Sequence, residues 1–411
     1  MIQADSEARP RIAVVTALLP TPEKPYRGLA IYSTVRALAE FANVFVVSAN
    51  AKYPQFLHPK HFHYVDSCAG FSPVGVATEY LHYRTIPLAG RPFNGFVCAR
   101  RIMPALRAWR PDLILSYWIY PDGFAALLAG RRLGVPVVVG SRGSDIRRLG
   151  DCVTAWFTRY TLRSVDRVLT VSEDLRQHAV ELGARPERVK AILNGCDLPL
   201  AGDDEKSSAR RALGIPANAR MVLYIGRLHP VKGVSDLLSA AGQLPHKNLR
   251  VVCVGEGILE TALRGQSESN GLHGRVFFPG PCRPEEVATW IAACDLICLP
   301  SYSEGCPNVV LEAIASGRPV IATNVGGTSE IVGPNSGILV PPGDLAQLRQ
   351  ALAAGLERSW DAAMIAAQFR RPWRQVAAET FAFCNEVIVE RRASAPLPAV
   401  PQRAWGQAAG G

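Results

Sequence analysis

The sequence has no long apolar run. Although 48% of its 411 residues are hydrophobic, polar residues interrupt every stretch before it reaches the roughly eighteen apolar residues that a membrane-spanning helix needs. The segment up to Arg9 is polar, unlike the apolar part of a secretory signal. We therefore expect a cytoplasmic protein without a spanning helix.

Metal-binding patterns are also scarce. The ten cysteines, from Cys68 to Cys384, include no C-x-x-C pair, and no D-x-D pair occurs. Scattered cysteines of this kind are expected to be reduced thiols of the core, with neither zinc nor disulfides. The histidine-rich stretch HPKHFH, residues 58–63, has no acidic or cysteine partner at ligand spacing. We predict no metal site and no cofactor.

The first strand and helix lack the glycine pattern of dinucleotide-binding proteins. A buried-type strand is predicted over residues 11–18 and a helix over 29–40, with Gly28 at the helix start, but the turn between them has no G-x-G-x-x-G. A nicotinamide-dependent dehydrogenase is therefore disfavoured. No nucleic-acid-binding motif is recognisable either.

Positive charge is concentrated in the first half of the chain. The net charge is +10, and residues 1–200 hold 25 Lys and Arg against 16 Asp and Glu. An anionic partner, such as a membrane leaflet or a lipid diphosphate, would explain this asymmetry. A solvated arginine-rich surface explains it equally well. The main contributors are Arg100, Arg101, Arg107, Arg110, Arg131, Arg132, Arg147 and Arg148.

Short apolar strands alternate with amphipathic helices along most of the chain. This rhythm predicts parallel sheets covered by helices on both faces, and the length allows two cores. We expect a first domain over residues 1–198 and a second over 199–370, with a polar linker over 198–208 between their cores. A C-terminal helix over 371–392 that returns to the first domain and a disordered tail over 393–411 are expected to follow. Residues 50–93 show few clear periodicities.

One stretch, residues 301–327, organises the second half. A predicted strand, 296–299, leads into a loop with Glu304 and Gly305, and a helix follows that begins near Pro307 and ends at Gly317. The free N–H groups at such a helix start suit a phosphate. Glu312 projects away from the apolar stripe of the helix, so both glutamates can accept hydrogen bonds from sugar hydroxyls.

Two cations follow an earlier strand of the same half. The segment GRLHPVKG places Gly226, Arg227 and Lys232 directly after a strand predicted over 221–225. Arg offers a planar fork of donors and Lys a point charge, a combination that suits a diphosphate. A further glycine turn, at Gly255, is expected near the nucleotide.

Together these segments resemble the family 4 glycosyltransferases, retaining enzymes of the GT-B fold, whose signature S-x-x-E-G-x-P-x-x-x-x-E-A-x-A-x-G-x-P-V is matched from Glu304 to Val320 at nearly every position. The resemblance implies two Rossmann-like parallel-sheet domains facing a central cleft. It implies catalytic roles for Glu304, Arg227 and Lys232, with Glu304 on the transferred sugar and Glu312 on the ribose. The implied donor-binding residues are Gly226, Gly255, Gly305, Asn308, Val309, Val310 and Glu312.

The first domain departs from this family at two motifs. Leu115 and Tyr117 occupy the positions of a common His-x-His, whose second histidine contacts the donor sugar in the family. The common His-Gly-x-Asp is present as Arg142, Gly143, Ser144 and Asp145. The candidates for the acceptor side or the cleft are Gly28, Tyr117, Arg142, Asp145 and Asn194.

We accordingly predict an enzyme that moves a sugar, with retention, from a nucleoside-diphosphate sugar of UDP or GDP type to a glycan or polyprenyl-diphosphate-linked acceptor. Cell-surface or exopolysaccharide synthesis at the inner membrane leaflet would fit the basic first half. Three alternatives stay open: a GT-B-fold sugar-nucleotide epimerase, a phosphorylase, and a non-catalytic nucleotide-sugar-binding protein. Tyr117 in the histidine position is the reason to keep the last one.

Overall fold

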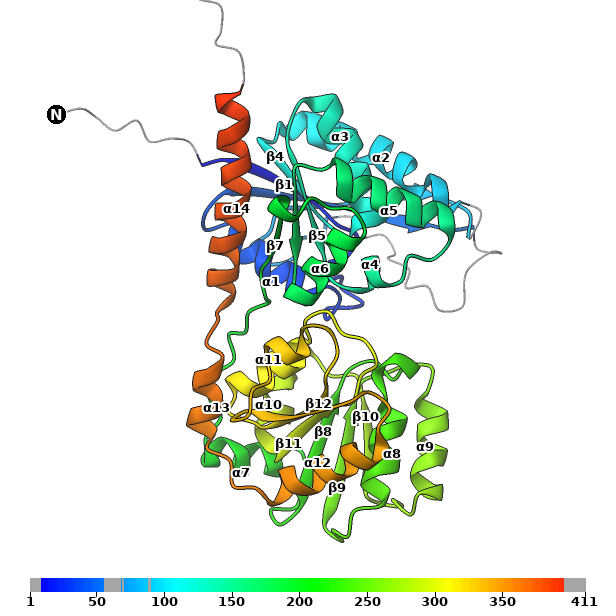
Figure 1. Ribbon diagram of the computed structural model, residues 1–411, viewed down its shortest axis with the longest axis vertical. Coiled ribbons are helices and arrows are strands. Elements are labelled where there is room, and N and C mark those ends of the chain that lie inside the picture. Colours follow the sequence, from blue (N-terminus) through cyan, green and yellow to red (C-terminus); the bar gives the residue numbers. More distant parts are fainter. Residues whose placement is uncertain (1–8, 55–67, 69, 88–89, 395–411) are drawn as a thin grey trace, which may run out of the picture.

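The computed structural model describes residues 9–54, 68, 70–87 and 90–394. The histidine-rich stretch and nearly all of the predicted disordered tail lie outside these residues. Two parallel sheets stand one above the other, each with helices on both faces (Figure 1). This arrangement confirms the predicted α/β architecture.

The first sheet has seven parallel strands in the order β3-β2-β1-β4-β5-β6-β7. Its central strands are runs of Val, Ile, Leu and Ala that are buried on both sides, as expected for a parallel sheet. The strands are β1 (Arg11–Val15), β2 (Asn43–Lys52), β3 (Thr78–Arg84), β4 (Leu113–Tyr117), β5 (Val137–Ser141), β6 (Arg167–Thr170) and β7 (Val189–Ala191).

Alternate residues of β1 belong to different cores. Ala13 and Val15 pack in one cluster with helices α2 (Asn94–Trp109), α3 (Phe124–Leu133), α5 (Cys152–Ser164) and α6 (Glu173–Glu181). Ile12 and Val14 pack in another, with α1 (Leu29–Leu38) and α14 (Trp373–Ala393). The period of two along a strand thus separates the two layers of helices.

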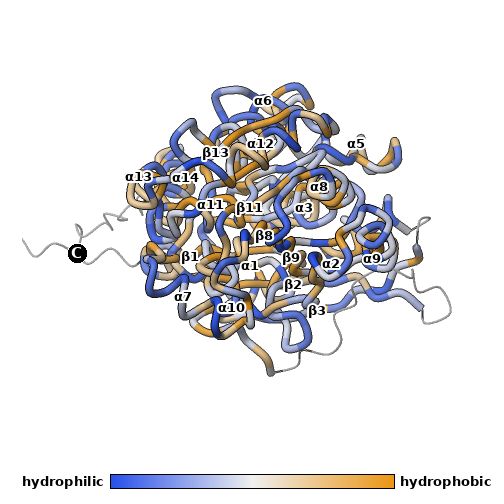
Figure 2. Tube along the Cα trace, turned by 90° about the horizontal axis from the view of Figure 1, so that it is seen from below, coloured by the Kyte–Doolittle hydropathy of each residue, from blue (hydrophilic) through white to orange (hydrophobic). Residues whose placement is uncertain are grey.

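The second sheet has six parallel strands in the order β10-β9-β8-β11-β12-β13, and one core cluster encloses it. The strands are β8 (Arg220–Ile225), β9 (Leu249–Val254), β10 (Val276–Gly280), β11 (Leu296–Leu299), β12 (Val320–Thr323) and β13 (Gly337–Val340). The helices are α7 (Asp203–Ala212), α8 (Val234–Gly242), α9 (Glu260–Ser269), α10 (Pro284–Ala293), α11 (Asn308–Ala315), α12 (Leu345–Glu357) and α13 (Ala362–Gln368). Figure 2 shows helices such as α6, α7 and α9 at the rim, with β8 and β11 nearer the middle.

The C-terminal helix α14 runs along the first sheet although it follows the second sheet in sequence (Figure 1). Phe383 and Val387 are buried in the core cluster that contains α1. Arg167 of β6 reaches Glu390 at 2.5 Å, and Arg374 reaches Glu40 at 2.8 Å. The chain therefore passes from the second domain back to the first.

Several sequence-based boundaries need correction. The predicted linker contains the start of α7 at Asp203, where three acidic residues occupy the first turn and suit the helix dipole. Strand β3 lies inside residues 50–93, where no clear pattern was recognised. The periodicity predicts an apolar stripe of Val309, Val310, Ala313 and Ile314 on α11. In the structure Leu311 is buried instead, and Val309 is only partly buried.

Among the residues that the structure describes, no helix is both long and apolar enough to span a membrane. Seven of the ten cysteines are buried.

The return of α14 should contribute strongly to stability. We expect Phe383→Ala, which empties a site that is 4% exposed, to lower the free energy of unfolding by about 3–5 kcal/mol. Val389→Ala on the same helix, where the side chain is 55% exposed, should change it by less than about 0.5 kcal/mol. Urea unfolding followed by circular dichroism measures both. Equal effects of the two variants would mean that α14 is not packed as described.

Candidate functional site

Glu304 lies in the loop after β11 and forms a buried ion pair with Lys232. The Lys232 Nζ to Glu304 Oε1 distance is 2.6 Å, and the two side chains are 18% and 9% exposed. The Ser301 hydroxyl donates to the same carboxylate oxygen at 2.6 Å. The sequence predicted a site role for each charged residue but not their direct contact.

Lys232 belongs to a short 3₁₀ turn, Pro230–Lys232, that follows β8. The His229 Nδ1 atom accepts a hydrogen bond from the Val231 N–H at 3.3 Å and so caps this turn. Burial lowers the pKa of His229, and the nearby Arg227, Arg148 and Lys232 lower it further. Both effects favour the neutral imidazole, and Arg148, which follows α4 (Ser144–Arg147), adds a positive charge from the first domain.

The Arg227 side chain is exposed, and a hydrogen bond to its carbonyl oxygen fixes its backbone. The buried Tyr224 hydroxyl donates to the Arg227 carbonyl oxygen at 2.8 Å. The two glycine turns after β8 and β9 touch each other, because a Cβ on Gly255 would lie 2.0 Å from the Gly226 oxygen. Both glycines have positive φ, at 139° and 156°, so side chains are excluded there on two grounds.

The N-terminus of α11 is open to a ligand. Pro307 is its N-cap residue and no side chain caps it. The N–H groups of Asn308 and Val309 donate to no acceptor among the described residues, while Val310 N–H bonds to the Pro307 oxygen. Free N–H groups and the helix dipole attract an anion to this point.

Glu312 lies one turn further along α11, partly exposed. Burial raises its pKa from 4.5 to about 7, and no opposing charge is near enough to lower it again. Burial raises the pKa of Cys196 and of Cys282, in the loop after β10, and the nearby charge of Glu312 raises both further. Among the residues that the structure describes, Glu312 has no cationic partner, and with a pKa of about 7 it can take either protonation state near neutral pH.

The loops at the carboxyl ends of the two sheets touch. A Cβ on Gly305 would lie 2.4 Å from the Arg142 carbonyl oxygen, and a Cβ on Gly143 would lie 3.2 Å from the Gly305 Cα. Only glycine allows the backbones of the two loops to approach so closely. The donor-side loop of Glu304 is thus positioned directly by the first domain.

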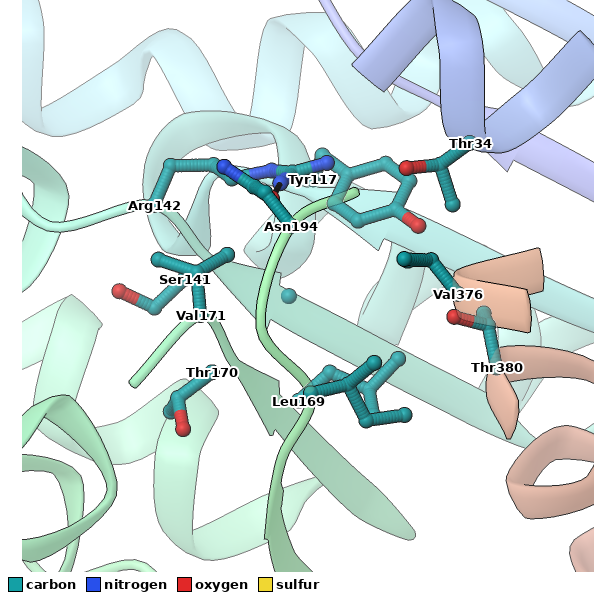
Figure 3. Close-up of a pocket in the computed structure, with 12 residues that line it drawn as sticks. Thr34, Tyr117, Ser141, Arg142, Leu169, Thr170, Val171, Asn194, Val376 and Thr380 are labelled. Carbon is teal, nitrogen blue, oxygen red and sulfur yellow. Dashed lines mark hydrogen bonds between the residues drawn. The ribbon is translucent and has the colours of Figure 1, made fainter. Parts of the chain in front are cut away.

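A chain of polar side chains crosses the same junction. Arg142 Nη1 donates to Asn194 Oδ1 at 2.5 Å, and Asn194 Nδ2 donates to Asn308 Oδ1 at 2.7 Å. The Arg142 guanidinium lies 4.7 Å from the centre of the Tyr117 ring (Figure 3). Three predicted residues of the acceptor side, Tyr117, Arg142 and Asn194, are therefore brought together with Asn308.

Tyr117 lies beneath Arg142 and is only 4% exposed. It lines a cavity of about 20 Å³ together with Thr34 of α1 and Thr380 of α14 (Figure 3). That volume holds about one water molecule. In this position the phenol supports Arg142, and direct contact with a ligand would require it to move.

The remaining candidates of the first domain, Asp145 and Gly28, determine the local conformation of the backbone. Asp145 Oδ1 accepts hydrogen bonds from the Ser141 hydroxyl and from the N–H groups of Arg142 and Gly143, at 2.9, 3.1 and 2.9 Å. It thereby shapes the turn that carries Arg142. Gly28 has φ 63° and starts α1, two residues after Tyr26, whose hydroxyl donates to Glu256 of the second domain at 2.8 Å.

One cross-domain contact has no counterpart in the sequence analysis. Glu330 of the second domain accepts hydrogen bonds from the N–H groups of Glu173 and Asp174 at 2.9 and 3.0 Å. Ser172 takes the next N–H, that of Leu175, so α6 is capped by residues of both domains. Glu330 lies fifteen residues after the end of α11, and no local sequence pattern predicts that it caps a helix of the other domain.

A second cavity of about 230 Å³ follows β10, lined by residues 279–282 and by Glu286, Thr289 and Trp290 of α10, with Leu213. Cys282 lines this cavity and also lies near enough to Glu312 for that charge to affect its pKa. Within the described part of the chain, no group of three or more His, Cys, Asp or Glu side chains is arranged to hold a metal ion.

Two family models match the chain. Residues 28–195 match the "Glycosyl transferase 4-like domain", and residues 205–371 match the "Glycosyl transferases group 1". The matched segments contain all the candidate site residues and every strand of the two sheets except β1.

Curated relatives carry glycosyltransferase names. D-inositol 3-phosphate glycosyltransferase 2 of Catenulispora acidiphila is 32% identical over 310 residues, which is 69% of this chain and 72% of that protein. TuaC of Bacillus subtilis, named as a teichuronic acid biosynthesis glycosyltransferase, is 31% identical over 250 residues. That match covers 60% of this chain, and the chain spans 61% of the length of TuaC.

Solved structures share the fold. HepE of Anabaena in complex with UDP-glucose has a TM-score of 0.68 and 21% identity, with 94% of this chain and 100% of that one covered. The catalytic domain of starch synthase IV from Arabidopsis thaliana, bound to ADP and acarbose, has a TM-score of 0.69 and 15% identity, with 93% and 100% covered. At these identities the likeness is one of fold.

The raised pKa of Glu312 makes stability depend on pH in a defined direction. Between pH 4.5 and about 7 the folded protein keeps a proton on Glu312 that the unfolded chain releases, so the free energy of unfolding falls as pH rises through this window. We expect Glu312→Gln to gain stability relative to the wild type over the same window, by up to about 3 kcal/mol, and then to level off. Urea unfolding at a series of pH values measures the difference.

The surface variant Glu260→Gln, at an ion pair with Arg264 on α9, is the control. A difference between Glu312→Gln and the wild type that is independent of pH would contradict the assigned environment of Glu312.

Proposed function

The chain belongs to the group 1 glycosyl transferases and has the GT-B fold, and from this premise we propose that it moves a sugar from a nucleoside-diphosphate sugar to a glycan or polyprenyl-diphosphate-linked acceptor. One observation supports this most directly. The Lys232–Glu304 pair lies in loops that also carry Arg227 and the open N-terminus of α11. An anion and a hydroxylated group can thus be bound side by side.

The diphosphate is the anion that fits this arrangement. Arg227 is exposed and Lys232 has only Glu304 as an ionic partner among the described residues. When a diphosphate arrives, Lys232 exchanges the carboxylate for phosphate oxygens, and the N–H groups of Asn308 and Val309 donate to it. Arg148 adds positive charge from the first domain.

The two glutamates would then bind hydroxyl groups on either side of the diphosphate. Glu304, released from Lys232, accepts hydrogen bonds from the transferred sugar. Glu312, which has no cation beside it, accepts them from the ribose, and this leaves the base near Cys282 and the cavity of about 230 Å³ after β10. HepE in complex with UDP-glucose shows that a neighbour of the same fold binds such a donor. We propose a UDP or GDP sugar.

Catalysis in this proposal is mainly electrostatic. As the bond between the anomeric carbon and the diphosphate oxygen breaks, Arg227, Lys232 and the α11 N-terminus stabilise the negative charge of the leaving diphosphate. The acceptor hydroxyl attacks from the same side, and a diphosphate oxygen takes its proton. The sugar passes through an oxocarbenium-like state and keeps its anomeric configuration. Attack by Glu304 as a covalent nucleophile is the less favoured course.

The acceptor would bind to the first domain. The turn of Arg142 and the start of α1 at Gly28 lie at the carboxyl end of the first sheet, where ligands of open α/β sheets bind. The excess of positive charge in residues 1–200 suits a lipid-linked diphosphate. TuaC, by its name, is a glycosyltransferase of teichuronic acid biosynthesis. We propose a role in cell-surface or exopolysaccharide synthesis at the inner leaflet of the membrane.

A non-catalytic nucleotide-sugar-binding protein is the second candidate. Tyr117 stands where the family often has a histidine that touches the donor sugar, and here the phenol is buried under Arg142. Such a protein would bind the donor without consuming it. A GT-B-fold epimerase would convert the donor without an acceptor.

The function is tested by turnover of a Glu304 variant. We expect Glu304→Gln to lower kcat by at least about 100-fold, because the sugar loses a charged hydrogen-bond acceptor in the transition state. Because Lys232 loses its ionic partner, the thermal unfolding temperature should fall, so turnover is measured at a temperature at which the variant is folded. Donor consumption, with chromatographic analysis of products in the presence and absence of a glycan-lipid extract, is the assay.

The matched control is Glu260→Gln, which removes an exposed carboxylate of α9 in the same domain and should leave turnover unchanged. Normal turnover of folded Glu304→Gln would contradict the assignment of Glu304 to the sugar-binding site. A new sugar nucleotide formed without acceptor would indicate an epimerase, and donor binding without any product would favour the binding protein.

A further inference from the structure

Five large apolar side chains of the first domain are exposed at one place. They are Phe93, Phe96, Val97, Val153 and Trp156, with 65, 46, 38, 42 and 57% of their surface accessible. Phe93 immediately precedes α2, Phe96 and Val97 lie in its first turn, and the other two lie in the first two turns of α5. We call these residues the aromatic face.

Direct ring contacts join the two helices into one surface. Phe157 of α5 contacts Phe96 of α2, with ring centroids 5.6 Å apart, and also Trp156, at 5.0 Å. Phe157 further packs on Phe124 of α3 at 4.8 Å. The aromatic face is therefore anchored on a packed aromatic layer and does not consist of isolated surface residues.

The charge around the aromatic face has a single sign. Residues 91–109 and 152–164 contain six arginines and no lysine, aspartate or glutamate. The acidic residues that flank these segments in the sequence are Asp112, Asp151 and Asp166. Each already accepts a hydrogen bond from a backbone N–H group, Asp151 as the N-cap of α5. The six arginines, all exposed, are Arg91, Arg100, Arg101, Arg107, Arg159 and Arg163.

The opposite side of the first sheet, which α14 covers, has charges of both signs. There α14 pairs its charges, with Arg167 against Glu386 and Glu390 at 3.2 and 2.5 Å. Figure 1 shows α2 and α5 on the side of the upper sheet away from α14. Elsewhere, exposed apolar residues such as Leu200 and Met364 stand apart from this arginine-rich segment.

We propose that the aromatic face and its arginines dock the first domain on an anionic lipid bilayer. Phe and Trp side chains beside valines suit the boundary between head groups and acyl chains, and arginines suit anionic head groups. A second copy of the same face would meet like charge and is disfavoured. This inference rests on the proposed function, because a lipid-linked acceptor would be presented at such a surface.

Single-stranded nucleic acid is the other ligand that combines aromatic and arginine contacts. It needs open ring faces on which bases stack. The Trp156 ring already lies nearly parallel to Tyr160, at 11° and 5.4 Å, and Tyr120 lies parallel to Phe157 at 14° and 5.6 Å. The rings are thus stacked on each other, and lipid is favoured over nucleic acid.

Flotation of the full chain with lipid vesicles tests the proposal. Vesicles of phosphatidylglycerol and phosphatidylcholine in equal parts are compared with pure phosphatidylcholine vesicles, at low and at high salt. We expect the wild type to float with the anionic vesicles, less so at high salt, and to stay behind with the neutral ones. The apolar variant is Phe96→Ser with Trp156→Ser, and the charge variant is Arg100→Glu with Arg107→Glu.

Each double variant should weaken vesicle binding at least about tenfold. Matched controls lie in the second domain: Met364→Ser, which is 52% exposed on α13, and Arg349→Glu on α12. These should bind vesicles like the wild type. Affinity for a nucleoside diphosphate is measured on every variant and should not change, because none of the substituted residues lies in the donor site.

The proposal is overturned if the wild type does not float with anionic vesicles, or if the controls lose as much binding as the double variants. Binding of oligonucleotides that the double variants abolish, without vesicle binding, would assign the face to nucleic acid instead. Vesicle binding without nucleoside-diphosphate binding would leave this inference standing and refute the proposed function. The reverse result would refute only the docking face.

Discussion

The ion pair between Lys232 and Glu304 is the interaction on which the account of this site depends. Two charges held 2.6 Å apart, with 18% and 9% of their side chains exposed, have lost most of their hydration, and each is compensated mainly by the other. Removing one partner would leave an uncompensated charge in a protein environment. Such a pair is a costly way to hold two loops together but a natural resting state for a site whose ligand carries both charge and hydroxyl groups.

The fold makes this pair possible because β8 and β11 are neighbours in the second sheet. Parallel neighbours end at the same edge, so the turn after β8 and the loop after β11 meet there although Lys232 and Glu304 are 72 residues apart in the chain. The first domain then completes the site. Its Arg142 loop touches Gly305, and its Asn194 side chain bonds to Asn308 at the start of α11.

Much of this could be predicted from the sequence, and the limits have physical reasons. Strand and helix periodicity predicted the parallel architecture. Glycines followed by Arg227, Lys232 and Glu304 predicted an anion site in the second domain, which stays a prediction. Strand order is a property of long-range pairing, so the direct contact between Lys232 and Glu304 was not predicted. The capping of α6 by Glu330 joins two domains and has no local signal. The burial of Tyr117 depends on α14, which packs there from the far end of the chain.

The most direct test of the account is calorimetric titration of UDP, GDP and ADP into the wild type, Lys232→Met and Glu304→Gln. Since Lys232 is proposed to exchange Glu304 for the diphosphate, the two variants should act in opposite directions. Lys232→Met should weaken binding of the preferred nucleotide at least about tenfold, whereas Glu304→Gln, which frees the lysine, should bind it as tightly as the wild type or more tightly. Equal weakening by both variants, or no effect of Lys232→Met, would contradict the claim that this ion pair is the resting form of the donor site.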